Sequence, residues 1–138
     1  MSSPQAQRSP ATGRRFDPPG VLIVDDENGV RQVVAAWLTH QGFPVWLAAD
    51  GREAVEAYRR HQSAIRIALL DVLMPDRDGP GVLADLRAIC PDLRACFMTG
   101  NSGRYTQDEL VGFGALAVFP KPLHLGEMVE ELLRLAVA

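Results

Sequence analysis

The chain has 138 residues, of which 47% are apolar and 22% charged, and its formal net charge is −3. This length suits one domain built around a single core, and the composition is that of an ordinary globular protein. The first 20 positions hold three basic residues and one acid, Arg8, Arg14, Arg15 and Asp17, so the remainder is more acidic than the whole. An acidic body argues against a surface for duplex nucleic acid, because lysine and arginine make the contacts to phosphates.

Export and membrane insertion are not indicated. No run approaches the roughly 18 uninterrupted apolar residues of a membrane helix, and the N-terminus lacks the apolar segment of a secretory signal. The two cysteines, Cys90 and Cys96, do not form a CxxC pair and have no histidine at metal-binding spacing. We therefore interpret them as reduced thiols and expect a cytoplasmic protein without a membrane-spanning segment.

Residues 1–19 differ in composition from everything that follows. They are rich in Ser, Pro, Gly and Arg and show almost no apolar periodicity. A segment of this kind cannot bury enough apolar surface to offset the entropy of ordering it. We predict a disordered leader or linker over 1–19 and one folded domain over 20–138.

From Gly20 onward, short apolar runs alternate with segments of helical periodicity. Runs of this length, bounded by turn residues, are typical of strands buried on both faces, and repeats at i, i+3, i+4 and i+7 indicate amphipathic helices. The first helix carries Val30, Val33, Val34, Trp37 and Leu38 on one face, and we expect this face, with Trp37, to lie in the core. In chain order, the pattern predicts strand 21–24, a helix ending before Gly42, strand 45–48, a helix around 54–58, strand 65–70, helix 80–89, strand 95–98, a weaker helix 105–113, strand 115–119 and helix 125–136.

Five strand–helix pairs in strict alternation predict a doubly wound α/β fold, a five-stranded parallel sheet with helices on both faces. In open sheets of this type, the functional site lies beyond the carboxyl ends of the strands. Polar residues follow four of the apolar runs at that edge: Asp25 and Asp26, Asp71, Thr99, and Lys121. We therefore expect these five side chains to meet.

This set of side chains suits phosphoryl transfer. Three carboxylates close together resist ionising unless a cation joins them, and Mg²⁺ prefers oxygen ligands. We predict that Asp26 and Asp71 bind Mg²⁺ (or Mn²⁺) directly, with Asp25 acting directly or through water. A cation, a lysine and a hydroxyl around one carboxylate would position a phosphoryl group and spread its charge, which makes Asp71 the candidate nucleophile, with Thr99 and Lys121 assisting.

Each of these residues has a simpler interpretation when taken alone. An aspartate after a strand is usually a helix cap or a turn residue, and a pair of aspartates in a loop is usually solvated. Four such features at four strand ends, in this order, are much harder to obtain by chance.

The same four segments resemble the receiver domain of two-component response regulators. Val-Leu-Ile-Val-Asp-Asp-Glu resembles its first strand with the acidic pair, and Leu-Leu-Asp-Val-Leu-Met-Pro-Asp-Arg-Asp-Gly its phosphoacceptor segment. Met-Thr-Gly and Phe-Pro-Lys-Pro resemble the segments with the phosphate-binding hydroxyl and the lysine. The resemblance covers Val21 to about Leu135.

The resemblance carries further expectations. It implies a flavodoxin-like (βα)₅ fold with strand order 2-1-3-4-5, Asp71 as phosphoacceptor, and a cis peptide between Lys121 and Pro122. It also implies that the backbone carbonyl of Leu73 is a metal ligand. Receivers accept a phosphoryl group from a phosphohistidine of a sensor kinase or phosphotransfer protein, and they are not classical enzymes, although they catalyse their own phosphorylation and dephosphorylation.

The sequence departs from the family pattern at Val118. An aromatic residue that responds to phosphorylation usually stands there, three residues before the lysine. Phe119 is adjacent, but successive strand residues point to opposite faces, so it cannot simply replace the missing ring. Leu73 and Asn101 stand at positions that modulate attack by water in this family. Leucine cannot hydrogen-bond a water, so we predict slow autodephosphorylation.

Three functions remain open at this point. The leading one is a stand-alone receiver that signals by protein contacts, possible dimerisation included, through the surface of residues 105–136, because the sequence ends soon after its last helix. A receiver cut from a hybrid kinase is a variant of it. An aspartyl-phosphate hydrolase dependent on Mg²⁺ is one alternative, although such enzymes carry a second Asp where Leu73 stands. A degenerate receiver acting only as a binding module is the other.

Overall fold

The computed structural model describes residues 17–100 and 104–137. Most of the predicted leader, residues 1–16, and the predicted modulating residue Asn101 lie outside the described residues. The elements alternate strictly between strand and helix, as the sequence predicts. They are β1 (Gly20–Val24), α1 (Asn28–His40), β2 (Val45–Ala48), α2 (Gly51–Arg60), β3 (Ile65–Asp71), α3 (Gly79–Ile89), β4 (Arg94–Thr99), α4 (Gln107–Gly112), β5 (Ala117–Pro120) and α5 (Leu125–Val137).

The strands form one parallel five-stranded sheet in the order β2-β1-β3-β4-β5, which confirms the predicted fold class. The chain adds β2 on one side of β1 and then β3 on the other side. The direction of winding therefore reverses between β1 and β3, and in such folds this is where a crevice opens at the carboxyl ends. Val24 pairs with Leu70, so the residues that follow, Asp25 and Asp71, lie side by side.

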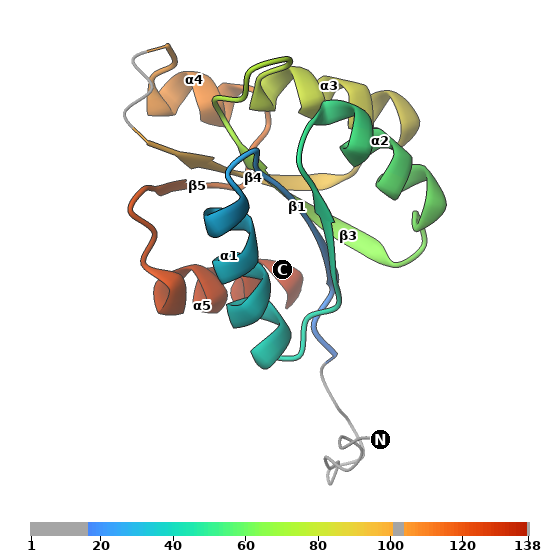
Figure 1. The fold of residues 1–138 in the computed structure, drawn as a ribbon, viewed down its shortest axis with the longest axis vertical. Coiled ribbons are helices and arrows are strands. Elements are labelled where there is room, and N and C mark those ends of the chain that lie inside the picture. Colours follow the sequence, from blue (N-terminus) through green and yellow to red (C-terminus); the bar gives the residue numbers. More distant parts are fainter. Residues whose placement is uncertain (1–16, 101–103, 138) are drawn as a thin grey trace, which may run out of the picture.

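Helices cover both faces of the sheet (Figure 1). On one face α1 and α5 pack over a core that includes Val21, Ile23 and Leu69, and on the other α2, α3 and α4 pack over Leu22 and Leu70. Alternate residues of β1 and β3 therefore enter opposite cores. This explains why their sequences are continuous apolar runs.

The first helix is less buried than its sequence pattern predicts. Val34 and Leu38 are fully buried, but Val33 is 49% and Trp37 44% exposed, so the prediction that Trp37 lies in the core was wrong. The two exposed residues are four positions apart, on one side of α1, and the apolar stripe is wider than the strip of sheet and α5 that covers it. The largest differences in bounds are in the last part of the chain, since β5 begins at Ala117 instead of residue 115 and α4 spans Gln107–Gly112 instead of 105–113.

Side-chain caps define the starts of three helices. Asp50 accepts a hydrogen bond from the backbone N–H of Glu53 at the start of α2, and Asp78 accepts one from Gly81 at the start of α3. Thr106 forms a capping box with Glu109 at the start of α4. Each cap satisfies an N–H that has no partner inside its helix, so the local sequence sets where these helices begin.

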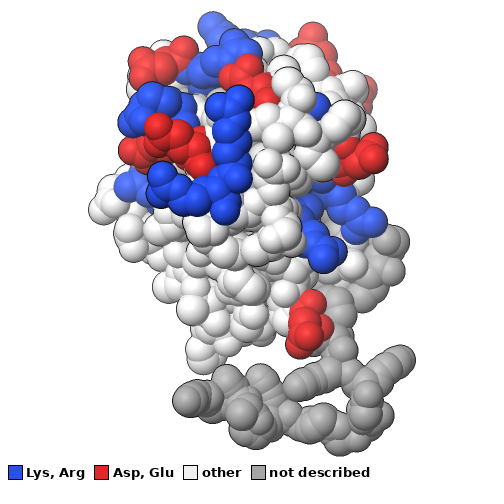
Figure 2. All heavy atoms as spheres, turned by 90° about the vertical axis from the view of Figure 1, so that its right-hand side faces the viewer, with Lys and Arg blue, Asp and Glu red and all other residues white. Residues whose placement is uncertain are grey.

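The face formed by α2 and α3 carries charges of both signs close together (Figure 2). Arg52 pairs with Glu56 at 3.0 Å within α2, and Arg77 pairs with Asp85 at 2.8 Å. A face of mixed sign does not resemble a basic surface for nucleic acid. None of the helices in the described part of the chain has the length and apolarity needed to span a bilayer.

Gly79 connects the fold to the carboxyl edge of the sheet. Its N–H donates to the carbonyl of Val72 at 2.8 Å, which turns the chain back after β3. A Cβ atom at this position would lie 2.5 Å from the backbone oxygen of Asp71. The backbone at the start of α3 therefore lies close to the backbone of Asp71, and a residue with a Cβ atom would not fit at position 79.

We predict that Gly79→Ala lowers the free energy of unfolding by about 1–3 kcal/mol, because backbone atoms would have to move apart. The matched control is Gly126→Ala in α5, where a Cβ would meet no atom within 4 Å. Urea unfolding of both variants checks this. Equal stability of the Gly79 variant and the wild-type protein would contradict the close approach.

Candidate functional site

Two buried carboxylates form the centre of the candidate site. Asp71 is the last residue of β3 and is 5% exposed, and Asp25, directly after β1, is fully buried. The Oδ1 of Asp25 accepts the N–H of Glu27 at 2.9 Å, which turns the chain from β1 into α1. Neighbouring strand ends thus place both carboxylates in the crevice that the sheet order creates.

Lys121 lies between the two carboxylates. Its Nζ is 3.1 Å from Oδ2 of Asp25 and 3.2 Å from Oδ1 of Asp71. The side chain reaches inward from the end of β5, where the N–H of Lys121 donates to the carbonyl of Thr99 at 2.8 Å. The peptide between Lys121 and Pro122 is cis, as the resemblance implies.

Burial and charge act in opposite directions at this cluster. Burial, together with the negative charge of Asp25, raises the pKa of Asp71 to about 7, and the hydrogen bond and positive charge of Lys121 only partly offset this. Burial tends to lower the pKa of Lys121, but hydrogen bonds and charges from Asp25 and Asp71 outweigh it, and the pKa is raised. The lysine therefore stays charged, while the carboxylates repel each other.

A third carboxylate completes an all-oxygen cluster. One oxygen from each of Asp25, Asp26 and Asp71 can be chosen so that all three lie within 4.8 Å of one another. Asp26 is exposed, so the cluster opens to solvent. A hard divalent cation such as Mg²⁺ fits this donor set, and it would relieve the repulsion that raises the pKa of Asp71.

Leu73 and Thr99 flank this cluster. Leu73 follows Asp71 by two residues with its side chain 44% exposed, and the role of its carbonyl as a metal ligand stays a prediction. Thr99 ends β4, beside β3, and its hydroxyl donates to the carbonyl of Gly100 at 3.1 Å. Thr99 is thus at the predicted edge, with its hydroxyl bound to the carbonyl of the next residue.

Val118 and Phe119 lie on opposite faces of the sheet, as strand alternation predicts. Val118 pairs with Phe97 and packs against the core under α3 and α4, whereas Phe119 pairs with Met98 and packs against the other core. The ring of Phe119 therefore does not replace the aromatic residue that is missing at Val118. What this means for signalling stays a prediction.

The structure adds Glu27 and Arg31, which we did not predict as part of the site. Oε1 of Glu27 is 3.5 Å from Nζ of Lys121, and Arg31 donates to the backbone carbonyl of Asp25 at 2.7 Å. Glu27 directly follows the acidic pair, and this adjacency was a usable signal. Arg31 gives no such signal, because its contact depends on how the first turn of α1 folds back over Asp25.

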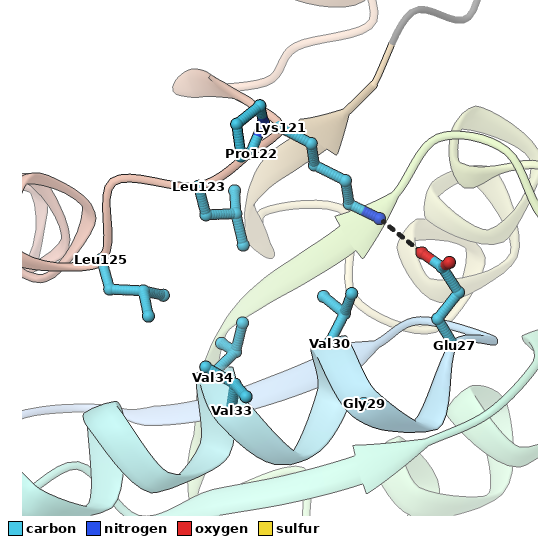
Figure 3. Close-up of a pocket in the computed structure, with 9 residues that line it drawn as sticks. All are labelled: Glu27, Gly29, Val30, Val33, Val34, Lys121, Pro122, Leu123 and Leu125. Carbon is cyan, nitrogen blue, oxygen red and sulfur yellow. Dashed lines mark hydrogen bonds and ion pairs between the residues drawn. The ribbon is translucent and has the colours of Figure 1, made fainter.

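An apolar groove of about 560 Å³ lies next to Lys121, between α1 and the segment that follows β5. Figure 3 shows the valines of α1 on one side and Leu123 on the other, with the chain of Lys121 crossing above them towards Glu27. Half-exposed Val33 lines this groove. The valines of α1 thus line one side of an apolar groove that ends at Lys121 and Glu27.

Comparison with known proteins places these features in a family. The family model described as "Response regulator receiver domain" matches residues 21–133 of this sequence. Sensor kinase CckA of Brucella abortus is 34% identical over 116 residues, covering 82% of this chain and 12% of the kinase. The probable transcriptional regulatory protein TcrX of Mycobacterium tuberculosis is 33% identical over 123 residues, covering 86% of this chain and 51% of that protein. The chain thus spans about half, or far less, of these two relatives.

Solved structures give the same result. The crystal structure of the CheX-CheY-BeF3-Mg²⁺ complex from Borrelia burgdorferi contains a chain that superposes with a TM-score of 0.77 at 28% identity. The match covers 88% of this chain and 92% of that one.

The raised pKa of Asp71 predicts how stability depends on pH without metal. Its folded-state pKa of about 7 lies above the ordinary 3.8, so the folded state binds the proton more tightly. The free energy of unfolding should therefore fall as pH rises from about 4 to 7. In the presence of a chelator at pH 8, we expect Asp71→Asn to be more stable than wild type, by on the order of 2 kcal/mol, and the difference to vanish near pH 4.

Urea unfolding at several pH values measures this difference. The exposed Asp76, on the loop after β3, provides the control, since Asp76→Asn should follow wild type throughout. A pH-independent effect of Asp71→Asn would contradict the assignment of a buried, repelled carboxylate.

Proposed function

This chain belongs to the response regulator receiver family, and from that premise we propose that it is a phosphoacceptor of a two-component relay, with Asp71 as the acceptor. Receiver domains of this family are signalling modules that work with a histidine kinase or phosphotransfer partner. The observation that carries the proposal is the contact of Lys121 with Asp25 and Asp71 inside an all-oxygen cluster.

In the proposed reaction, an oxygen of Asp71 attacks the phosphorus of a phosphohistidine. A P–O bond forms, the P–N bond breaks, and the leaving imidazole takes up a proton. Asp25, Asp26, Asp71 and the carbonyl of Leu73 would hold Mg²⁺ (or Mn²⁺), which supplies positive charge for the phosphoryl oxygens. Lys121 would exchange its contact with Asp71 for a phosphoryl oxygen, and the hydroxyl of Thr99 would leave the carbonyl of Gly100 to donate to another.

The groove beside Lys121 supports access by a partner protein. It is lined mainly by apolar side chains, and its charged end is formed by Glu27 and Lys121. A partner that buries apolar residues there would bring its phosphohistidine to the edge of the sheet where Asp71 is located. Such a partner and such chemistry belong to the cytoplasm, where we place the chain.

Incubation with acetyl phosphate and Mg²⁺ tests the acceptor. We expect one phosphoryl group on the peptide that contains Asp71, and none after addition of a chelator. Asp71→Asn should abolish it, whereas Asp76→Asn, on the loop that follows β3, should not. Intact-protein and peptide mass spectrometry provide the measurement.

The alternatives give different outcomes in the same assay. Absence of any modification would favour a receiver that acts only as a binding module. Rapid, repeated turnover of phosphate monoesters would favour the hydrolase.

The lifetime of the phosphoryl group provides a second test. Leu73 is 44% exposed and has no group that could hydrogen-bond an attacking water. We expect slow dephosphorylation and a several-fold faster rate in Leu73→Asn, because the amide can orient that water. The decay of the phosphorylated protein after removal of acetyl phosphate measures both, and loss within seconds in the wild-type protein would contradict the prediction.

A further inference from the structure

Helix α4 packs on β5 and is joined to α3 by side-chain hydrogen bonds near its two ends. Its residues, Gln107–Gly112, bury one side chain, Leu110. At its C-terminal end, Arg87 of α3 donates to the carbonyls of Phe113 at 2.8 Å and Gly114 at 3.1 Å. With only Leu110 buried, the packing of α4 is weak enough for side-chain hydrogen bonds to α3 to influence its position.

At its N-terminal end, α4 is joined to α3 by one carboxylate. The hydroxyl of Tyr105 donates to Oδ2 of Asp78 at 2.6 Å, and Oδ1 of Asp78 accepts the N–H of Gly81 at 2.9 Å. Tyr105 immediately precedes Thr106, the N-cap of α4. The side chain of Asp78 is 19% exposed, so the two hydrogen bonds form in a partly desolvated place, where a charged acceptor strengthens them.

The ring of Tyr105 lies on the sheet face where an aromatic residue of β5 is missing. It packs against the core cluster that includes Phe97 and Leu110, and Val118 packs against that same cluster. It also packs nearly perpendicular to the ring of Phe113, with the ring centroids 5.6 Å apart. Tyr105 therefore contacts both ends of α4, through its position before the N-cap and through its ring.

Asp78 is linked to Asp71 through the backbone of the next residue, Gly79. Gly79 lies so close to the backbone oxygen of Asp71 that a Cβ atom on Gly79 would be only 2.5 Å from that oxygen. On the other side of the site, the hydroxyl of Thr99 is still bound to the carbonyl of Gly100. A phosphoryl group on Asp71 would draw that hydroxyl inward and disturb the backbone against which Gly79 packs.

We propose that the hydrogen bond between Tyr105 and Asp78 holds α4 in its resting position, and that Tyr105 reports the state of Asp71 in place of the aromatic residue absent at Val118. The inference rests on the proposed function of Asp71. A contact made in the resting state alone favours that state, so its removal shifts the population towards the phosphorylated form and strengthens binding of a phosphoryl mimic.

The test uses the whole chain, Mg²⁺ and beryllofluoride. Tyr105→Phe keeps the ring and removes the hydroxyl, and we expect it to bind beryllofluoride about fivefold more tightly than wild type. Without ligand, the amides of α4 should exchange hydrogen faster in the variant. Titration calorimetry gives the affinity, and hydrogen exchange read by mass spectrometry gives the state of α4.

A second variant removes the same bond from the other side. Asp78→Ser retains a capping oxygen for α3 but is too short to reach Tyr105. It should raise the affinity as Tyr105→Phe does. Asp78→Ser also removes the ion pair of Asp78 with Arg104, 3.4 Å long. The double variant should therefore bind as Asp78→Ser does, because Tyr105→Phe then has no further bond to remove. Asp76→Ser, which removes a charge from the same loop, is the matched control and should behave as wild type.

The outcomes separate the two proposals. Tighter binding in both single variants, without additivity, supports the role of Tyr105. Wild-type affinity in Tyr105→Phe, with an α4 that still responds to beryllofluoride, overturns it and leaves the acceptor function intact. Failure of the wild-type protein to bind beryllofluoride with Mg²⁺ overturns both.

Discussion

The ion pairs of Lys121 with Asp25 and Asp71 are the interaction on which the rest of the structure depends. Two carboxylates lie side by side, fully or almost fully buried, because β1 and β3 are neighbours in register. Burial of charges is costly unless they are paired, and one ammonium group cannot neutralise both. The cluster is therefore left with excess negative charge, and burial together with the charge of Asp25 raises the pKa of Asp71. A site that lacks positive charge in this way is suited to bind a cation and then a phosphoryl group.

Backbone contacts at the edge of the sheet link the charged cluster to helices on the surface. Thr99 ends β4 and Lys121 directly follows the neighbouring β5, and their backbones are joined by a hydrogen bond of 2.8 Å. On the other side, Gly79 couples the start of α3 to Asp71, and Asp78 couples α3 to α4. Helix α4, with one buried side chain, is thus linked through α3 to the backbone of Asp71. Elements with little buried surface are those that can move at small cost, which suits them to carry a signal.

Much of the site was predictable because parallel sheets bring strand ends together. Asp25, Asp26, Asp71, Thr99 and Lys121 could be placed at one edge without coordinates, since each stands at the end of an apolar run. The errors arose because a helical pattern shows which side of a helix is apolar but not how much of that side other elements cover. Trp37 follows the helical period of α1, yet it is 44% exposed because none of the described elements covers that side. The groove beside Lys121, the contact of Arg31 and the bond between Tyr105 and Asp78 depend on loop paths, for which the sequence has no periodic signal.

The sequence by itself determined the fold class, the strand ends and the residue types available for chemistry, because hydrophobic period and turn residues are local properties. It also determined that the residue at position 118 has no ring. The tertiary structure alone decided which carboxylates are buried, how Lys121 divides its contacts between them, and where the ring of Tyr105 lies. These depend on strand register and on packing between segments far apart in the chain. The distance from Lys121 to Asp25, across 96 positions, is set by the whole sheet and not by any one motif.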